Sequence, residues 1–140
     1  MYTSTYSVVV HSTSIQIVYK RGEMHVHISS SDCQLLYPDN TSTEFTVELP
    51  VAINTESYQV GLTQIYFKGE AFCVLTADIC QESIIHCTLS PVLATFFKSA
   101  NIANPAYKTI VRDYIKRIHF TLQSSEKIEE FYFTLHFKEI

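Results

Sequence analysis

Apolar and polar residues alternate most clearly along the stretch from Asn40 to Phe67. In its first half, Phe45, Val47 and Leu49 occupy every second position. Because successive side chains of a strand point to opposite faces, this spacing predicts a strand with one apolar face. Pro50 follows directly, and we expect it to end the strand, since proline has no N–H to donate to a sheet.

A second strand is predicted in the latter half of the same stretch, where Val60 and Leu62 lie on one face. The apolar positions then shift by one residue to Ile65 and Phe67. Such a shift turns the apolar set to the other face of a strand, so the pattern predicts a bulge or bend near Thr63. Two long strands with a bend are typical of a β-sandwich whose strands pass from one sheet to the other.

Shorter runs of alternating, β-branched or aromatic residues predict the remaining strands. They cover residues 6–11, 15–19, 24–28, 72–80, 84–89, 107–111, 118–122 and 131–137. Two tight turns are expected, around Gly22 and Gly69, because glycine tolerates a positive φ. Pro91 suits the first position of a helix, so Val92–Ser99 is predicted as the one short helix.

These eight to ten strands and the near absence of helix predict an all-β protein, an antiparallel two-sheet sandwich of the single jelly-roll type. An immunoglobulin-like sandwich is the alternative, and it is disfavoured because the chain has no Trp and no cysteine pair around one. A length of 140 residues fits a single jelly-roll domain over residues 1–140. Within it, residues 1–14 are expected to form an N-terminal arm that can be exchanged with a neighbouring subunit.

The composition is that of a folded protein and limits the function classes. Hydrophobic residues make up 46% and charged residues 17% of the chain, which argues against disorder. The formal net charge of −4 argues against a nucleic-acid surface spread over the whole protein. Basic residues gather between Lys108 and Arg117, interleaved with Tyr107 and Tyr114. There, a solvated edge or a subunit contact is favoured over nucleic-acid binding.

The four cysteines, Cys33, Cys73, Cys80 and Cys87, lack the close spacing of zinc ligands. Three of them fall in apolar, strand-like runs, so we expect buried free thiols and a reducing compartment. The N-terminus does not have the pattern of a secretory signal, and no run approaches the ~18 apolar residues of a membrane span. We therefore expect a protein that is neither secreted nor held in a membrane.

The sequence offers little for catalysis. His25 and His27 share one strand face, as two metal ligands of a cupin do, but no glycine-rich motif with a further histidine follows. Outward histidines on an exposed or interfacial face are favoured, and we predict no metal site and no cofactor. Asp78 lies in a very apolar run, where an acid that caps backbone groups at a strand end is favoured over a catalytic one. No nucleophile elbow or phosphate loop is present, so we do not expect an enzyme.

The central stretch resembles a pattern in capsid proteins of Polinton/Maverick elements and adintovirus-like DNA viruses. In that pattern an asparagine precedes Phe-x-Val-x-Leu-Pro, and a Val-Gly-Leu-x-x-Ile run follows after a spacer. The matching positions here are Asn40, Phe45, Val47, Leu49, Pro50, Val60, Gly61, Leu62 and Ile65, with Asp78 in a later strand-aspartate region. The likeness covers residues 35–140. Ser57–Gln59 replace a tryptophan and an acid often found there, and a long insertion after the second strand is missing.

The resemblance implies a structural virion protein, a penton-like or minor capsid subunit reduced to a single jelly roll. Such a subunit would form a homo-oligomeric ring, with a pentamer favoured over a trimer, and would contact other capsid proteins in an icosahedral shell. It would be assembled inside the host cell, in the nucleus or the cytoplasm. His25, His27, Tyr107 and Tyr114 are the candidate interface residues, because surfaces with tyrosine and little charge suit subunit contacts. The alternative is a lectin-like or cytokine-like β-sandwich that binds a ligand at its loops.

Overall fold

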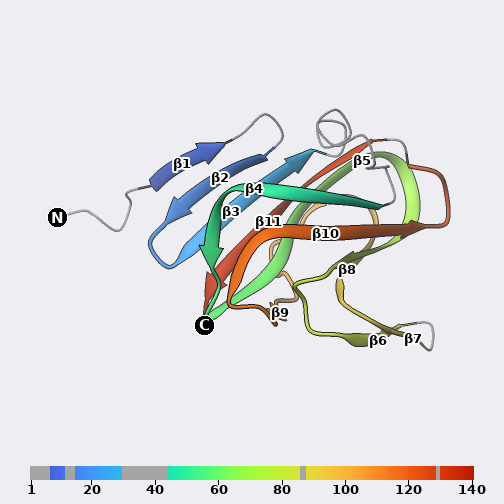
Figure 1. Cartoon of the computed structure of the whole chain (residues 1–140). Helices are drawn as coiled ribbons and strands as arrows, with labels where there is room; N and C mark the ends of the chain where they lie inside the picture. The colour runs from blue at the N-terminus through green and yellow to red at the C-terminus, as the bar shows by residue number, and fades with distance from the viewer. Residues whose placement is uncertain (1–6, 12–14, 30–43, 86–87, 129) are drawn as a thin grey trace.

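The computed structural model describes residues 7–11, 15–29, 44–85, 88–128 and 130–140. All regular secondary structure in these segments is β-strand, which agrees with the predicted all-β class (Figure 1). The strands are β1 (Ser7–His11), β2 (Ile15–Lys20), β3 (Glu23–Ser29), β4 (Glu44–Asn54), β5 (Tyr58–Ala77), β6 (Ser83–Ile85), β7 (Thr88–Ser90), β8 (Val92–Asn101), β9 (Lys108–Thr109), β10 (Tyr114–Ser124) and β11 (Phe131–Glu139). None of the described segments contains a helix long and apolar enough to cross a membrane.

The fold is organised around β5, which is 20 residues long and curves through the molecule (Figure 1). Its first half pairs with β11 and β9, and its second half pairs with β10. β8 pairs with β5 along much of its length. The result is a nine-stranded antiparallel sheet in the order β1-β2-β3-β11-β5-β10-β4, with β8 and β9 also paired to β5.

The curl of this sheet produces two layers that face each other. One layer is β3-β11-β5-β9, extended by β2 and β1, and the other is β4-β10-β5-β8. The chain crosses from one layer to the other between β3 and β4, between β4 and β5, within β5, and then at each step from β8 to β9, β9 to β10 and β10 to β11. This arrangement is a jelly roll, so the predicted fold class is confirmed. The layers are halves of one continuous sheet, because β5 passes between them without interruption.

The bend in β5 begins where the sequence predicts it and extends further. Opposite β11, Gln64 and Leu62 pair with consecutive residues, so Thr63 is the bulged residue. The tight turn predicted around Gly69 is wrong, because β5 continues through it and its pairing with β8 is irregular on both sides of Glu70. Gly69 has a φ of +93°. This backbone angle belongs to a bend here, since the chain continues into residues 73–77, which are buried and pair with β10 rather than returning along β5.

Two further expectations that rest on prolines are wrong. β4 spans Glu44–Asn54 and includes Pro50, where the sequence places its end. β4 is the last strand of the sheet, and its register with β10 shifts between Glu48 and Ile53, so the ladder does not require an N–H at the proline. The segment Val92–Ser99 is not a helix but part of β8, which pairs with β5.

The side chains of β8 follow the period of a strand. Thr95 and Phe97 are exposed, whereas Phe96 between them packs against the core. Pro91 precedes the first residue of the strand, and its carbonyl accepts a hydrogen bond of 3.0 Å from the N–H of Ala77. The proline therefore starts an edge strand, a position that suits it as well as the first turn of a helix.

The predicted strand at residues 84–89 is instead a hairpin of β6 and β7, in which Ile84 pairs with Leu89. This hairpin is a separate two-stranded sheet that projects from the body (Figure 1). The strand predicted at 107–111 is reduced to β9 and a bridge between Cys80 and Ile110.

Parts of the N-terminal predictions lie outside the described residues. They include residues 1–6 and 12–14 of the expected arm, together with Asn40. Between the two arm segments, β1 pairs with β2 of the same chain. Exchange of the arm between subunits stays a prediction.

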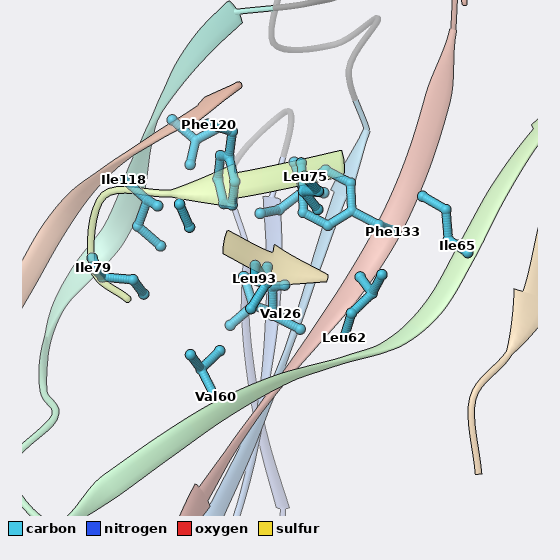
Figure 2. Close-up of a cluster of buried hydrophobic side chains, with 14 of the residues drawn as sticks. Val26, Val60, Leu62, Ile65, Leu75, Ile79, Leu93, Ile118, Phe120 and Phe133 are labelled. Carbon is cyan, nitrogen blue, oxygen red and sulfur yellow. The ribbon is translucent and has the colours of Figure 1, made fainter. Parts of the chain in front are cut away.

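The core lies between the two layers, where side chains from both converge (Figure 2). Phe45 of β4 packs on Phe131 and Phe133 of β11, with ring centroids 5.5 and 6.3 Å apart, so aromatic rings join the layers. The largest fully buried side chains are Phe45, Phe120, Phe131, Phe133, Phe137, Ile17, Ile28, Leu49, Ile65, Leu75 and Ile79.

Two of the cysteines belong to this core. Cys73 and Cys80 are buried free thiols, as predicted. Burial raises the pKa of Cys73 to about 11 and that of Cys80 to about 12, so both thiols stay protonated and unreactive near neutral pH. Cys33 and Cys87 lie outside the described residues.

Candidate functional site: the outer face of the β3–β11–β5 layer

The polar side chains of β3 and β11 meet on the face of their layer that points away from the core. Met24, Val26 and Ile28 are buried, so His25 and His27 point outward, as predicted. The register places His25 opposite His136, His27 opposite Thr134, and Ser29 opposite Tyr132. A row of histidine, threonine and tyrosine therefore runs along the outside of the layer.

One end of this face carries Glu23, His25 and His136, which we name the histidine cluster. The rings of His25 and His136 stack with centroids 4.5 Å apart and planes 12° apart. One carboxylate oxygen of Glu23, Oε1, lies 3.2 Å from His25 Nε2 and 3.7 Å from His136 Nε2. The side chain of His136 is 12% exposed. Among the described residues, its Nε2 is a buried atom without a hydrogen-bond partner.

Tyr107 covers the cluster from the segment before β9. Its hydroxyl lies 2.6 Å from His136 Nδ1, and the Nζ of Lys138 lies 5.5 Å from the centre of its ring. Gly61 of β5 is opposite His136 in the ladder, and a Cβ there would lie 3.0 Å from a carbon of the Tyr107 ring and from Pro105 Cβ. The absence of a side chain at Gly61 lets Tyr107 lie close to the sheet and reach His136.

The middle of the face is held by neutral hydrogen bonds. His27 Nδ1 lies 2.9 Å from the hydroxyl of Thr134, which also lies 3.3 Å from Gln64 Oε1. The bulged Thr63 donates its hydroxyl to the Thr134 carbonyl at 3.3 Å. These contacts fix the orientation of His27 away from the histidine cluster.

Burial and neighbouring charges shift the ionisation of this face. Burial lowers the pKa of His136 and of His27, and the charge of His25 lowers both further. Burial alone would raise the pKa of Glu23, but its hydrogen bond with His25 and the nearby charge of His136 lower it overall. Burial raises the pKa of Tyr107, as does Glu23. Near neutral pH these shifts favour the neutral forms of His27 and His136 beside the ionised carboxylate of Glu23.

The other end of the face carries a pair of tyrosines. Tyr66 of β5 and Tyr132 of β11 are opposite each other in the ladder, with ring centroids 5.8 Å apart in an edge-on arrangement. They are 58% and 42% exposed. A shallow hollow of about 380 Å³ lies beside them, lined by Ser29, Tyr66, Lys68, Glu130, Phe131 and Tyr132.

The predicted interface residues are only partly brought together. His25, His27 and Tyr107 share this outer face, whereas Tyr114 is 67% exposed at the start of β10 in the other layer. The interface role of all four stays a prediction. Sequence reasoning missed Glu23 and His136, although the alternation of β11 shows that His136 points outward.

The residues that carry the family resemblance mostly pack the core. Phe45, Val47, Leu49, Val60, Leu62 and Ile65 are all buried. Their alternation is thus explained by packing between the layers. Gly61 differs from them, because its lack of a side chain accommodates Tyr107 on the outer face.

Asp78 has the capping role that the sequence favours, although it is exposed rather than buried. Its Oδ1 accepts a hydrogen bond of 3.0 Å from the backbone N–H of His119 and one of 2.9 Å from Arg112. Nearby, Arg117 pairs with Glu48 at 3.2 Å, and Lys116 donates to the Leu49 carbonyl at 2.7 Å.

In the Lys108–Arg117 segment, Arg112 and Arg117 are therefore paired with carboxylates, and Lys116 is bonded to a backbone carbonyl. The structure therefore explains its basic residues as links between β10, β4 and the turn after β5. No cluster of phosphate-seeking side chains is needed to account for them.

The fold and this face define an antiparallel jelly-roll protein whose outer surface is rich in tyrosine and histidine. No protein-family model matches the chain, and no curated protein matches it. Among solved structures, the chain is similar to the crystal structure of the mavirus penton protein, with a TM-score of 0.36 and 8% identity. The alignment covers 100% of this chain but 60% of the penton chain, so this chain spans less than two thirds of that protein. A likeness of this size decides neither function nor assembly.

Proposed function

We propose that the protein is a structural subunit of a virion, a penton-like or minor capsid protein that assembles into a ring. Jelly rolls occur in viral capsids and also in lectins and cupins, so the fold by itself names no function. The observation that carries the proposal is that two of the exposed apolar areas on the described surface differ in shape, one a projecting hairpin and the other a tyrosine pair beside a hollow. The family resemblance of residues 35–140 agrees with it.

The first patch is the hairpin of β6 and β7. Ile84 is 76% exposed and Leu89 is 59% exposed, and the two pair directly across the hairpin. A two-stranded hairpin that stands alone in water is marginally stable. Contact with a neighbouring molecule would bury both side chains and stabilise the hairpin.

The second patch is the tyrosine pair Tyr66 and Tyr132 with the hollow beside it. Protein interfaces are enriched in tyrosine and depleted in Lys and Glu. The hollow is open and partly apolar, which suits a protruding apolar element better than it suits a small molecule enclosed on all sides.

Two different patches on one chain are what a closed ring requires. In a head-to-tail contact, one surface of a subunit meets a different surface of the next, and the contact repeats until the ring closes. We infer that the hairpin of one copy docks on the tyrosine pair of its neighbour. The resemblance favours five copies over three, within a shell that contains other capsid proteins.

A mixing experiment tests this pairing of patches. The hairpin variant carries Ile84→Ser and Leu89→Ser, and the face variant carries Tyr66→Ser and Tyr132→Ser. Each variant alone should be monomeric by analytical ultracentrifugation, whereas the wild type forms rings visible by electron microscopy. An equimolar mixture should form heterodimers and no rings, because the face variant keeps an intact hairpin and the hairpin variant keeps an intact face.

Phe97→Ser is the matched control, since Phe97 is 51% exposed but belongs to neither patch. It should leave ring formation unchanged. A wild-type chain that stays monomeric at high concentration contradicts the proposal. Mixtures that never dimerise contradict the pairing of the two patches, even if rings form by another contact.

One observation supports a second candidate, a lectin-like module. The hollow beside Tyr66 and Tyr132 joins exposed aromatic rings to the charged groups of Lys68 and Glu130, a mixture that suits a polar ligand with an apolar face. Binding of the monomer to a glycan array, lost in the face variant, would favour this function over assembly.

A further inference from the structure

We propose that the histidine cluster of Glu23, His25 and His136 binds one divalent transition-metal ion of the zinc class. The proposal is independent of the assembly role. The site lies on the outer face of the jelly roll and joins β3 to β11, two strands that are far apart in the sequence.

The donor atoms already lie close to the geometry of a bound ion. Tetrahedral zinc holds nitrogen and oxygen ligands at about 2.0–2.2 Å, which places two ligands of one ion about 3.3 Å apart. Here Glu23 Oε1 is 3.2 Å from His25 Nε2 and 3.7 Å from His136 Nε2. All three donor atoms lie within 4.8 Å of one another. The two rings must tilt from their stacked arrangement, which brings the donor atoms closer together by at most about 1.5 Å.

The partners of His136 also fit a metal ligand. Its Nε2 is buried and lacks a hydrogen bond, while its Nδ1 is engaged by the Tyr107 hydroxyl at 2.6 Å. A histidine that binds zinc through one nitrogen usually donates its other N–H to an oxygen, which fixes the ring. Tyr107 supplies that oxygen, so it is the positioning residue of the site.

The donor set points to the class of ion. Two imidazoles and one carboxylate suit Zn²⁺ and its neighbours Co²⁺, Ni²⁺ and Cu²⁺, whereas Mg²⁺ and Ca²⁺ prefer oxygen ligands throughout. Three protein ligands leave one tetrahedral position for water. An ion there would link β3 to β11 in the folded state only, so binding should raise the melting temperature.

The test is a zinc titration of the tag-free chain by calorimetry, at about pH 7.5, where histidines are neutral. The wild type should bind one ion per chain. His25→Gln and His136→Gln should each weaken binding at least tenfold. Tyr107→Phe should weaken it roughly tenfold, within the range for lost outer-shell partners. His27→Gln is the matched control, because His27 is on the same strand and face but bonds to Thr134 instead.

NMR of the wild type keeps the test valid if a variant fails to fold. Zinc should shift the imidazole signals of His25 and His136 and leave those of His27 and His119 in place. Absence of stoichiometric binding overturns the proposal. So does zinc binding that His27→Gln weakens as strongly as His136→Gln, because the ion would then lie elsewhere on the face.

Discussion

Replacing Gly61 by alanine should displace Tyr107 from His136 while leaving the fold largely intact. The new Cβ would lie 3.0 Å from Tyr107 Cδ1 and from Pro105 Cβ. Carbon atoms in good contact lie about 3.5–4.0 Å apart, so the ring and the proline must move outward by roughly 0.5–1 Å. That movement lengthens the 2.6 Å contact between the Tyr107 hydroxyl and His136 Nδ1.

Three effects of Gly61→Ala decide its cost. Overpacking of a rigid site costs about 1–3 kcal/mol, but Pro105 and Tyr107 are only half-buried and can give way. Loss of the hydrogen bond costs about 0.5–1.5 kcal/mol. Alanine also lowers the conformational entropy of the unfolded chain, which offsets about 0.4–1 kcal/mol of this loss of stability. We expect the free energy of unfolding to fall by about 1 kcal/mol.

The sharper readout of Gly61→Ala is the titration of His136. Burial is the main cause of its lowered pKa, and Tyr107 covers its ring. When Tyr107 moves away, water reaches the ring and the pKa should rise towards the ordinary value of about 6.5. An NMR titration of the histidine ring protons measures this shift.

Gly69→Ala is the matched control. At Gly61 a new Cβ would be crowded by Tyr107 and Pro105, whereas at Gly69 there is space but the backbone angle is unfavourable. No atom lies within 4 Å of a Cβ at Gly69, but its φ of +93° is unfavourable for any side chain. Backbone strain should cost about 1–2 kcal/mol and leave the titration of His136 unchanged. An unchanged His136 pKa in Gly61→Ala, or an equal shift in both variants, would refute the claim that the missing side chain at Gly61 lets Tyr107 cover His136.

Three further outcomes follow from the core, the titrating groups and the cap. Phe133→Ala should lower the free energy of unfolding by about 3–5 kcal/mol in urea denaturation, whereas Phe97→Ala at an exposed site should change it by less than about 1 kcal/mol. Because the pKa values of His27 and His136 are lowered on folding, the unfolded chain binds more protons below about pH 6.5. Stability should therefore fall as the pH drops from there through the folded-state values, and replacing both histidines with glutamine should flatten that slope in thermal melts. Asp78→Ala removes the acceptor of two hydrogen bonds and should cost about 1–2 kcal/mol in the same urea assay.

Period-two alternation predicts those strands whose one face is buried and whose other face is polar. β3, the centre of β10 and β11 satisfy this condition, and their buried residues match the predicted inner positions. The bulge at Thr63 was predictable for the same reason, because a slipped residue exchanges the faces and leaves a visible change of phase.

Local sequence patterns do not predict the structure where one residue type is equally compatible with two kinds of element. A glycine with positive φ forms a turn or a bend, and only the burial of the residues after Gly69 decides between them. Proline starts a helix or an edge strand, and pairing with β5 decides this for β8. These outcomes depend on tertiary contacts, which the local pattern does not contain.

The histidine cluster depends on strand register, and this explains why the sequence did not reveal it. His25 and His136 are adjacent because β3 pairs with β11 in one particular register. Alternation shows that both side chains point outward, but it does not show which strand is the neighbour. The sequence draws attention to His25 and His27 instead. These two lie on the same face, but His25 contacts Glu23 whereas His27 contacts Thr134.

The two proposals meet on β11, where His136 lies four residues beyond Tyr132. At about 3.3 Å per residue, the two ends of the face are about 13 Å apart. If the docked hairpin covers only the tyrosine pair, zinc should bind equally well to rings and to monomeric variants. If the contact extends over His25, His27 and Tyr107, as the sequence predicts, assembly would hold the cluster away from solvent and zinc affinity would depend on oligomeric state. Comparing zinc affinity in the wild-type ring and in the hairpin variant, whose face is intact, therefore measures how far the interface extends.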